Sequence, residues 1–486
     1  MHLGLVLDMA NSAFGDRGAI TVSEGTFDYG VVSGYSWAAS RFFGDLGVPS
    51  VIYLGSNHLA YPVSLFGAAG AGIPFIPLNY RLGAEQLAAQ HDAHAGSFVI
   101  YEGERPPFAD PELSAERQAF IDGLDAEGTE PPQEPDPDLP CVLLYTSGTT
   151  AAPKAAVLRH RHLMSYVLGT VEFAGADEDD ATLVSVPPYH VAGVANLLSN
   201  LYAGRRIIYL DRFAPETWLQ IVREEKVTQA MVVPTMLAQI VAYLADAGDA
   251  ETPSLRSLSY GGSRMPIPVL SRALELFPNT GFVNAYGLTE TSSTIALLGP
   301  EDHRAAFESD DPGVRGRLGS VGRLVPGIEL EVRDEDGKEV EPGRAGLLFL
   351  RGEQISGEYA GVTLLEDDGW FPTRDRGWID SEGYVFVEGR ADDTIIRGGE
   401  NIAPAEIEDV LVSHDGIVDA VVVGLPDEQW GQRLVAVVVA TPGAEPDAEE
   451  LRELVRTVLR SSKTPEAVEF WPELPRTDTG KLLRRT

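Results

Sequence analysis

Residues 51–77 are VIYLGSNHLAYPVSLFGAAGAGIPFIP, and this stretch decides the fold class. It begins with a short run of β-formers (51–54) and continues with a small, apolar stretch typical of a packed helix (61–71). It ends with a second buried run, 72–77. Strands and helices that alternate at such short intervals favour a parallel sheet covered by helices. We therefore expect an α/β fold.

The same alternation continues on the C-terminal side of this stretch. Strands are expected at 98–101, 141–145, 182–186, 206–210 and 229–233, and helices at 215–225 and 235–247. The proline-rich residues 131–140 cannot continue a helix or a central strand, so they are expected to form a linker.

The pattern changes from about Ser320 onward. Residues 327–333 alternate strictly between apolar and polar, and Asp336-Gly337 and Pro342-Gly343 are turn signals before the apolar run 346–351. This pattern predicts a half-exposed antiparallel sheet. After Gly389-Arg390 a compact unit is expected, with strands at 418–423, 434–440 and 468–470 and a helix at 447–461.

Composition narrows the class of protein. A chain of 486 residues favours two or more domains. Its 37 Lys+Arg and 73 Asp+Glu give a net charge of -36, which disfavours non-specific nucleic-acid binding but not a small nucleotide ligand. The single cysteine, Cys141, favours a reducing cytoplasm. No apolar run approaches the roughly 20 residues of a membrane span, and Asp8 interrupts the N-terminal apolar stretch, which makes it a poor secretory signal.

The residues 145–154, YTSGTTAAPK, follow a buried strand directly. Short hydroxyl side chains and backbone N–H groups in a tight turn form a concavity that binds anions, and Lys154 adds a point charge. The Gly-Lys-Ser/Thr ending of a Walker A loop is absent. Because Ser, Thr and Gly dominate turns in general, an ordinary polar turn between a strand and a helix stays open as the alternative.

A second candidate segment is NAYGLTET, residues 284–291. Tyr286 is suited to stacking on a base, Thr289 to bonding a phosphate, and Glu290 to holding Mg²⁺ through hard oxygen ligands. The alternative is a helix cap, in which the last two are ordinary residues of a first turn.

A third candidate is TRDRGWID, residues 373–380. Asp375 is suited to accepting both hydroxyl groups of a ribose, as acidic residues do in many nucleotide sites. The alternative is a surface ion pair with Arg374 or Arg376. By contrast, a metal site at the pair His160 and His162 is disfavoured, because no Cys or acidic ligand lies near in sequence.

Two more segments lie in the last quarter of the chain. Residues 389–401, GRADDTIIRGGEN, lie where the composition changes, and small and acidic residues at such a junction suit a hinge. Residues 475–485, PRTDTGKLLRR, carry Lys481 after a glycine; the alternative is a basic, frayed tail.

These segments occur together and in a fixed order: YTSGTTAAPK, PPYHVAG (187–193), NAYGLTET, TRDRGWID, GRADDTIIRGGENI and PRTDTGKLLRR. In this order they resemble the core motifs of the adenylate-forming superfamily, which includes acyl-CoA synthetases, the adenylation domains of peptide synthetases, and luciferases. The resemblance covers essentially the whole chain. It implies a large N-terminal domain of helix-covered mixed sheets with a β-barrel-like subdomain (1–389), a hinge (390–392), and a small mobile α+β domain (393–486).

The resemblance also implies a reaction in two halves. A carboxylic acid attacks the α-phosphate of Mg²⁺-bound ATP and gives an acyl-adenylate and pyrophosphate. A nucleophile, most often the thiol of coenzyme A, then displaces AMP. The first half brings an anionic carboxylate to a polyanion, so fixed donors and cations must neutralise the charge that moves onto the leaving pyrophosphate.

Particular residues take roles by this resemblance. The β- and γ-phosphates would be held by Thr146, Ser147, Gly148, Thr149, Thr150 and Lys154. The adenosine would be held by Asn284, Ala285, Tyr286 and Gly287 around the base, by Gly261 and Gly262, which let backbone approach, and by Asp375 on the ribose with Arg390 beside it. Thr289 would meet the α-phosphate, Glu290 would bind Mg²⁺, and Lys481 would bridge the carboxylate and the α-phosphate.

The second half resembles a rearrangement about Asp392, which would withdraw Lys481 and bring residues 397–401 to the site. His190 resembles the residue that lines the acyl pocket, and the alternative is a structural histidine of the core. The chain departs from the family at Ala151 and Ala155, where glycine is common. Because alanine does not take positive φ freely, the phosphate loop is expected to be stiffer while still using ATP.

Three functions stay open at this point. The first is an AMP-forming acyl-CoA ligase, the second is an amide-bond synthetase in which an amine replaces the thiol, and the third is a non-catalytic nucleotide-binding relative. The third is disfavoured because Glu290, Asp375 and Lys481 occur together. The acid pocket is expected to draw on 190–193, 234–236 and 261–262, whose small and apolar residues suit an aryl or medium-chain acid. A homodimer is expected only by analogy with the family.

Overall fold

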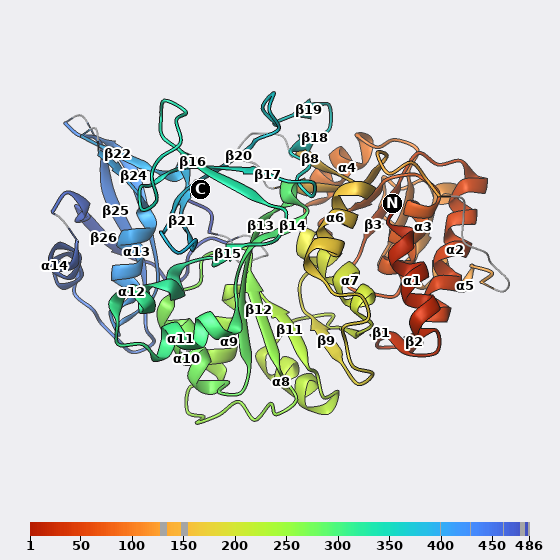
Figure 1. Ribbon diagram of the computed structural model, residues 1–486, viewed down its shortest axis with the longest axis horizontal. Coiled ribbons are helices and arrows are strands. Elements are labelled where there is room, and N and C mark those ends of the chain that lie inside the picture. The colour runs from red at the N-terminus through yellow and green to blue at the C-terminus, as the bar shows by residue number, and fades with distance from the viewer. Residues whose placement is uncertain are drawn as a thin grey trace.

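The computed structural model describes residues 1–126, 134–146, 154–398, 400–427, 429–459, 461–476 and 482–484. In this part of the chain the strands form sheets of nine, eight, four, three and two strands. Helices cover the two largest sheets, so the predicted α/β class is confirmed. Figure 1 shows the N-terminal helices at one end of the molecule and the C-terminal sheet at the other.

The stretch that decided the fold class forms the middle of the eight-stranded sheet. Strand β3 (Val51–Leu54) pairs in parallel with β4 (Phe75–Pro77) on one side and with β5 (Phe98–Tyr101) on the other. Between them lies α3 (Ala60–Gly70), in which every residue is buried. A β-carbon added at Gly67 would lie 2.7 Å from the β-carbon of Ala39, because α3 packs closely on α2 (Tyr29–Leu46). The small residues of this stretch therefore serve helix–helix packing.

The same sheet holds the two strands that flank the predicted phosphate loop. They are β7 (Pro140–Thr146) and β8 (Lys154–Arg159), and they pair antiparallel with Thr146 opposite Lys154. The described residues on either side of 147–153 are thus two paired strands, and α6 (His160–Thr170) begins only after the second of them. The alternative of a turn between a strand and a helix is wrong, because the next described element is the strand β8, which the sequence analysis had not predicted.

The nine-stranded sheet runs in the order β15-β14-β13-β12-β11-β9-β10-β1-β2. Its parallel centre consists of β10 (Arg206–Tyr209), β9 (Ala181–Val184), β11 (Gln229–Val232), β12 (Ser257–Gly261) and β13 (Gly281–Leu288). The chain turns back at β14 (Ser293–Leu298), which pairs antiparallel with β13. Residues at the carboxyl ends of parallel strands meet at one edge of a sheet, which is where ligands bind in open α/β sheets.

Helix α7 (Val191–Ala203) was not predicted from the sequence. The two helices that were predicted in this part of the chain are confirmed as α8 (Pro215–Glu224) and α9 (Pro234–Tyr243). The last helix was expected to reach residue 247, but it ends earlier because Ala245 and Ala247 form turns instead, donating to the carbonyl oxygens of Ala242 and Leu244.

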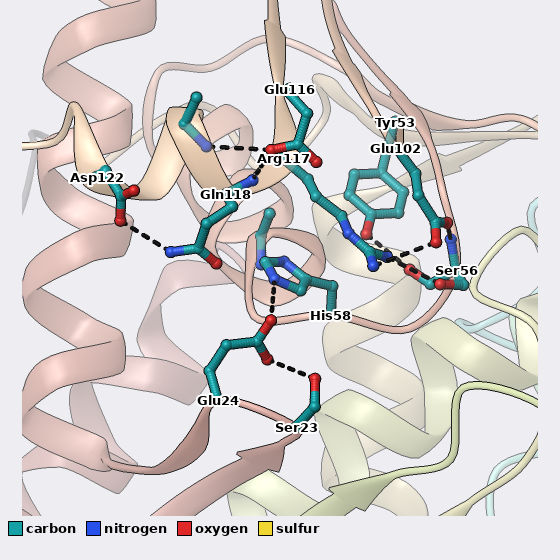
Figure 2. A network of polar contacts seen from close by, with 12 residues as sticks. Ser23, Glu24, Tyr53, Ser56, His58, Glu102, Glu116, Arg117, Gln118 and Asp122 are labelled. Carbon is teal, nitrogen blue, oxygen red and sulfur yellow. Dashed lines mark hydrogen bonds and ion pairs between the residues drawn. The ribbon is translucent and has the colours of Figure 1, made fainter. Parts of the chain in front are cut away.

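A polar network joins the two large sheets near the carboxyl end of β3 (Figure 2). His58 lies 3.6 Å from Glu24, which belongs to the turn between β1 (Gly18–Val22) and β2 (Gly25–Asp28) of the other sheet. Arg117 donates to Ser56 Oγ at 2.8 Å and lies 3.2 Å from Glu102. Asn57 also donates to the carbonyl of Val186 at 3.1 Å. The network therefore fixes the end of β3 against the segment that leads into PPYH.

The C-terminal third has the antiparallel pattern expected from its sequence. Strands β16 (Glu329–Arg333), β17 (Gly346–Arg351), β20 (Phe371–Ile379) and β21 (Val385–Arg390) form one antiparallel sheet. It meets the nine-stranded sheet through a bridge between Gly322 and Val385.

A smaller α+β unit follows and has a hydrophobic core of its own. Its elements are β22 (Ile395–Arg397), β23 (Glu400–Ile402), α13 (Pro404–Val412), β24 (Ile417–Asp427), β25 (Gly431–Ala440), α14 (Ala448–Val458) and β26 (Ala467–Phe470). An ion pair between Arg264 and Asp409 connects this unit to the loop that follows β12. Among the helices of the described residues, none is both long and apolar enough to cross a membrane.

Three histidines of the core make the stability of the protein depend on pH. His160, His162 and His303 are fully or almost fully buried. Burial lowers their pKa values to about 4, about 3 and about 4. Because the unfolded chain binds protons below pH 6.5 and the folded chain does not, the free energy of unfolding should fall as pH decreases from 6.5 toward 4. Each histidine should contribute a loss of about 2 kcal/mol by pH 5.

Chemical denaturation at pH 7 and pH 5, at constant ionic strength, measures this effect. The His303→Gln variant should remove the part of the pH-dependent loss that His303 contributes. Burial raises the pKa of Asp409 to about 6, so the folded protein binds a proton there between pH 7 and pH 5. This proton raises the free energy of unfolding at pH 5, by less than the histidines lower it. A free energy of unfolding that is the same at both pH values would contradict the prediction.

Candidate active site

Three predicted nucleoside-binding residues come together where β13, β20 and β21 meet. The hydroxyl of Tyr286 donates to Asp375 Oδ2 at 2.5 Å, and Arg390 Nε lies 3.2 Å from Asp375 Oδ1. Asp375 is opposite Arg390 in the register of β20 and β21 and is 5% exposed. The Thr373 hydroxyl donates to the carbonyl of Leu348 at 2.8 Å and accepts from the backbone N–H of Asp375 at 2.9 Å. The predicted alternative for Asp375, a surface ion pair with Arg374 or Arg376, is wrong because its partner Arg390 comes from the neighbouring strand.

Electrostatics confirm that these groups share one environment. Burial, and then the neighbouring Asp375 carboxylate, raise the pKa of Tyr286 well above its usual value. Burial lowers the pKa of Arg390, but the charges around it outweigh burial and raise it overall; the strongest is Asp375, and Glu290 and Tyr359 contribute. Tyr286, Asp375, Arg390, Glu290 and Tyr359 therefore form a single polar cluster.

Glu290 lies in a short 3-10 turn, η2 (Thr289–Thr291), directly after β13. The helix predicted as the alternative is thus only one turn long. The Tyr359 hydroxyl donates to Glu290 Oε1 and lies 3.4 Å from Thr146 Oγ1. Burial, and then the Glu290 carboxylate, raise the pKa of Tyr359 to about 12, so the phenol stays protonated. Tyr359 was not among the predicted site residues.

The backbone around Glu290 is unusual. Ser292 and Ser293 have φ values of 55° and 113°, a region that residues other than glycine rarely adopt. A β-carbon at Gly287 would lie 1.8 Å from the carbonyl oxygen of Ser293, so the bulge between β13 and β14 requires glycine there. Strained backbone of this kind concentrates at functional sites, where the surrounding structure holds it.

The predicted glycines at the end of β12 have structural reasons of their own. A β-carbon at Gly261 would lie 2.3 Å from the carbonyl oxygen of Ala285 on the neighbouring strand, and Gly262 has a φ of 87°. Asn284 donates to the carbonyl of Ser320 at 3.1 Å. These residues place the ends of β12 and β13 side by side, at the same edge as Tyr286.

His190 precedes α7 and lies at the same edge, after β9. Its backbone N–H donates to Pro187 at 3.3 Å, and its ring lies 4.6 Å from the ring of Tyr189. A β-carbon at Gly193 would lie 3.0 Å from the carbonyl oxygen of Pro187, so PPYHVAG forms a tight turn. His190 is only partly buried, which distinguishes it from the core histidines.

Several predicted residues lie outside the described part of the chain. They are Ser147, Gly148, Thr149, Thr150, Ala151 and Lys481. Thr146 and Lys154 are described, at the last position of β7 and the first of β8. Ala155 is buried in β8.

The predicted hinge residue Asp392 lies in the 3-10 turn η4 (Ala391–Asp393) between β21 and β22. A small cavity beside this turn is lined by charged side chains of both units: Arg376, Glu388, Arg390, Asp393 and Arg484. Arg484 donates to Glu408 of α13 and lies 3.8 Å from Asp393, so the end of the chain is attached next to the turn.

The residues present fit a magnesium ion. Mg²⁺ takes oxygen ligands and is usually bound by one or two carboxylates together with substrate phosphates. Glu290 offers such a carboxylate close to Thr146 at the edge of the phosphate loop. The described residues contain no group of three or more His, Cys, Asp and Glu side chains that could hold a metal by themselves.

Sequence comparisons identify the family. Residues 9–360 match the model of the AMP-binding enzymes, and residues 406–481 match that of the AMP-binding enzyme C-terminal domain. The chain belongs to the AMP-binding enzyme family. It is therefore an AMP-forming ligase that activates a carboxylic acid with ATP, and the non-catalytic alternative is wrong.

Relatives of known activity span nearly the whole chain. The fatty acid–[acyl-carrier-protein] ligase ScoC of Streptomyces coeruleorubidus is 34% identical over 461 residues, covering 90% of this chain and 85% of the relative. Feruloyl-CoA synthase of an Amycolatopsis species is 35% identical over 444 residues, covering 89% and 87%.

Solved structures of AMP-binding enzymes share the fold. The o-succinylbenzoate CoA synthetase of Bacillus subtilis, in complex with an acyl-adenylate intermediate, has a TM-score of 0.84 at 25% identity and covers 99% of this chain and 96% of its own. The amide bond synthetase McbA of Marinactinospora thermotolerans has a TM-score of 0.85 at 24% identity, with coverage of 99% and 98%.

Proposed function

We propose that this AMP-forming ligase transfers its activated acyl group to the thiol of coenzyme A. Two observations support this proposal: feruloyl-CoA synthase is an acid–thiol ligase by name and covers most of the chain, and the polar cluster has the parts that adenylation needs. The cluster of Tyr286, Asp375, Arg390, Glu290 and Tyr359 is the observation that carries the adenylation half.

The residues divide into three tasks in the first half-reaction. Tyr286 and Asp375 bind the adenosine, the aromatic ring against the base and the carboxylate on the ribose, and Arg390 pairs with that carboxylate and orients it. Thr146 to Thr150 and Lys154 bind the β- and γ-phosphates. Thr289 and Lys481 orient the α-phosphate, where the bond to the acid forms as pyrophosphate leaves.

Glu290 would hold the Mg²⁺, which supplies positive charge to the phosphate oxygens when bound. His190 lines the acyl pocket.

We further propose that residues 393–486 turn about Asp392 between the two half-reactions, so that residues 397–401 replace Lys481 at the site. In that case the contact of Arg264 with Asp409 belongs to only one of the two arrangements. A cytoplasmic location and a homodimer complete the proposal, and light scattering tests the latter.

Pyrophosphate release over a panel of aryl and medium-chain acids tests the first half. Acid-dependent release with ATP is expected, and its absence for every acid would contradict the proposal. Mass spectrometry then identifies the product with coenzyme A, with an amine, and with an acyl-carrier protein in separate reactions. A thioester of coenzyme A is expected; an amide formed in preference would assign the enzyme to the amide-bond synthetases.

Replacing the ribose-binding carboxylate should weaken nucleotide binding. The Asp375→Asn variant keeps the size of the side chain but loses the charge that pairs with Arg390 and accepts the ribose hydroxyls. A hydrogen bond to a charged group contributes about 1.5–3 kcal/mol, so KM for ATP should rise by about tenfold or more. The matched variant Asp380→Asn, in the turn after β20, should leave KM for ATP unchanged. An unchanged KM in Asp375→Asn would contradict the assigned role.

A further inference from the structure

The segment 354–360 lies against the turn that carries Glu290, and we call it the clasp. The backbone N–H groups of Ser356 and Gly357 both donate to the carbonyl oxygen of Glu290, at 2.9 and 3.2 Å. The buried Gln354 side chain donates to the carbonyls of Thr291 and Thr294, each at 2.9 Å. The clasp therefore holds the backbone at Glu290 and just after it.

The clasp is also bound to the strand that leaves the phosphate loop. Tyr359 pairs with Ala156 of β8, and the N–H of Ala360 donates to the carbonyl of Ala155 at 3.1 Å. Glu358 forms a two-pronged ion pair with Arg159, with distances of 3.0 and 2.7 Å. Two segments that are far apart in sequence, η2 and β8, are thus held in a fixed relation by a third.

The Tyr359 side chain completes this connection at the site itself. Its hydroxyl donates to Glu290 Oε1 and lies 3.4 Å from Oγ1 of Thr146, which is the last residue of β7 and the first of the predicted phosphate-binding residues. The phenol thus lies between the proposed metal-binding carboxylate and the edge of the phosphate-binding loop. It is a neutral donor, so it orients the carboxylate without cancelling its charge. A lysine or arginine in its place would cancel that charge.

We propose that Tyr359 is a positioning residue for the metal ion: its hydroxyl orients the Glu290 carboxylate, and so sets the affinity of the ATP-bound enzyme for Mg²⁺. This inference rests on the proposed function, in which Glu290 binds Mg²⁺. Carboxylates that ligate metals are themselves held by hydrogen bonds, and loss of such a partner typically lowers metal affinity or activity by about 10- to 100-fold.

The Tyr359→Phe variant tests the inference because it removes only the hydroxyl group. The measurement is the Mg²⁺ concentration that gives half of the extra thermal stabilisation by ATP, followed without any acid substrate. This concentration should rise about tenfold in the variant. Stabilisation by ATP in EDTA, and the melting temperature of the ligand-free protein, should stay close to those of the unmodified enzyme.

Tyr384→Phe is the matched control. The Tyr384 hydroxyl donates to Asp302 at 2.6 Å, a tyrosine–carboxylate contact of the same kind outside the cluster. Its loss should leave the Mg²⁺ midpoint unchanged. Half-maximal Mg²⁺ for pyrophosphate release should shift in Tyr359→Phe in parallel with the thermal midpoint, whereas a purely structural role would lower the melting temperature and leave both midpoints unchanged.

Glu290→Gln separates this inference from the function on which it rests. If Glu290→Gln leaves the Mg²⁺ midpoint unchanged, the proposed metal role of Glu290 fails, and the role of Tyr359 fails with it. If Glu290→Gln raises the midpoint and Tyr359→Phe does not, only the inference about Tyr359 is overturned.

Discussion

Pyrophosphate release by the Lys481→Ala variant is expected to fall by about 10²–10³-fold, the usual loss when one fixed group that stabilises transition-state charge is removed. The physical reason is the charge of the reactants. An anionic carboxylate must approach a triphosphate inside a protein with a net charge of -36, and a lysine that contacts both can offset their repulsion. ATP binding should change little, because the adenosine and the β- and γ-phosphates are assigned to other residues.

The role assigned to Lys481 also predicts which step survives. Because that role is to offset charge during adenylation, the melting temperature of Lys481→Ala should stay close to that of the unmodified enzyme. Transfer from a supplied acyl-adenylate to coenzyme A should stay within about threefold of the unmodified enzyme, since Lys481 has left the site by then in the proposed cycle.

Lys338→Ala is the matched control, because Lys338 is an exposed lysine in the turn before β17. It should release pyrophosphate at the normal rate. Near-normal release by Lys481→Ala, measured with the same acid, would refute the role assigned to the lysine.

Local patterns in the sequence were sufficient to predict the α/β fold class. The alternation in residues 51–77 predicted two parallel strands and the helix between them, because each element is short and buried along its whole length. The same reasoning missed β8, whose residues continue directly from the phosphate loop. Its strand conformation depends on pairing with β7 and β18 (Glu358–Tyr359), and the latter partner lies some 200 residues further along the chain.

The candidate site was predicted residue by residue but not in its connections. Tyr286, Asp375 and Arg390 were each named from a motif, and the structure joins them by hydrogen bonds across β13, β20 and β21. Tyr359 was missed because nothing in the sequence around it marks a site. Its importance arises from Glu290, which is 69 positions away in sequence and becomes its neighbour only in the folded chain.

The chain between the two units offers the second test of large expected effect. Asp392→Pro should slow acyl transfer to coenzyme A by about 100-fold, a loss of the size caused by misplacing reacting groups by about 1 Å. Proline fixes φ near −65°, which lies within the range of a 3-10 turn such as η4. The arrangement in which Arg264 contacts Asp409 is therefore retained, whereas the backbone rotation proposed for the second half-reaction is blocked.

Asp392→Ala is the matched control, because it removes the same side chain and leaves the backbone free to rotate. If the hinge acts through its backbone, this variant should transfer the acyl group within about threefold of the normal rate, and both variants should form acyl-adenylate normally. Two outcomes would contradict a hinge at this residue: an equal loss of both half-reactions in Asp392→Pro, or the same slow transfer in both variants. The second would mean that the carboxylate, rather than the rotation of the chain, is what acyl transfer requires.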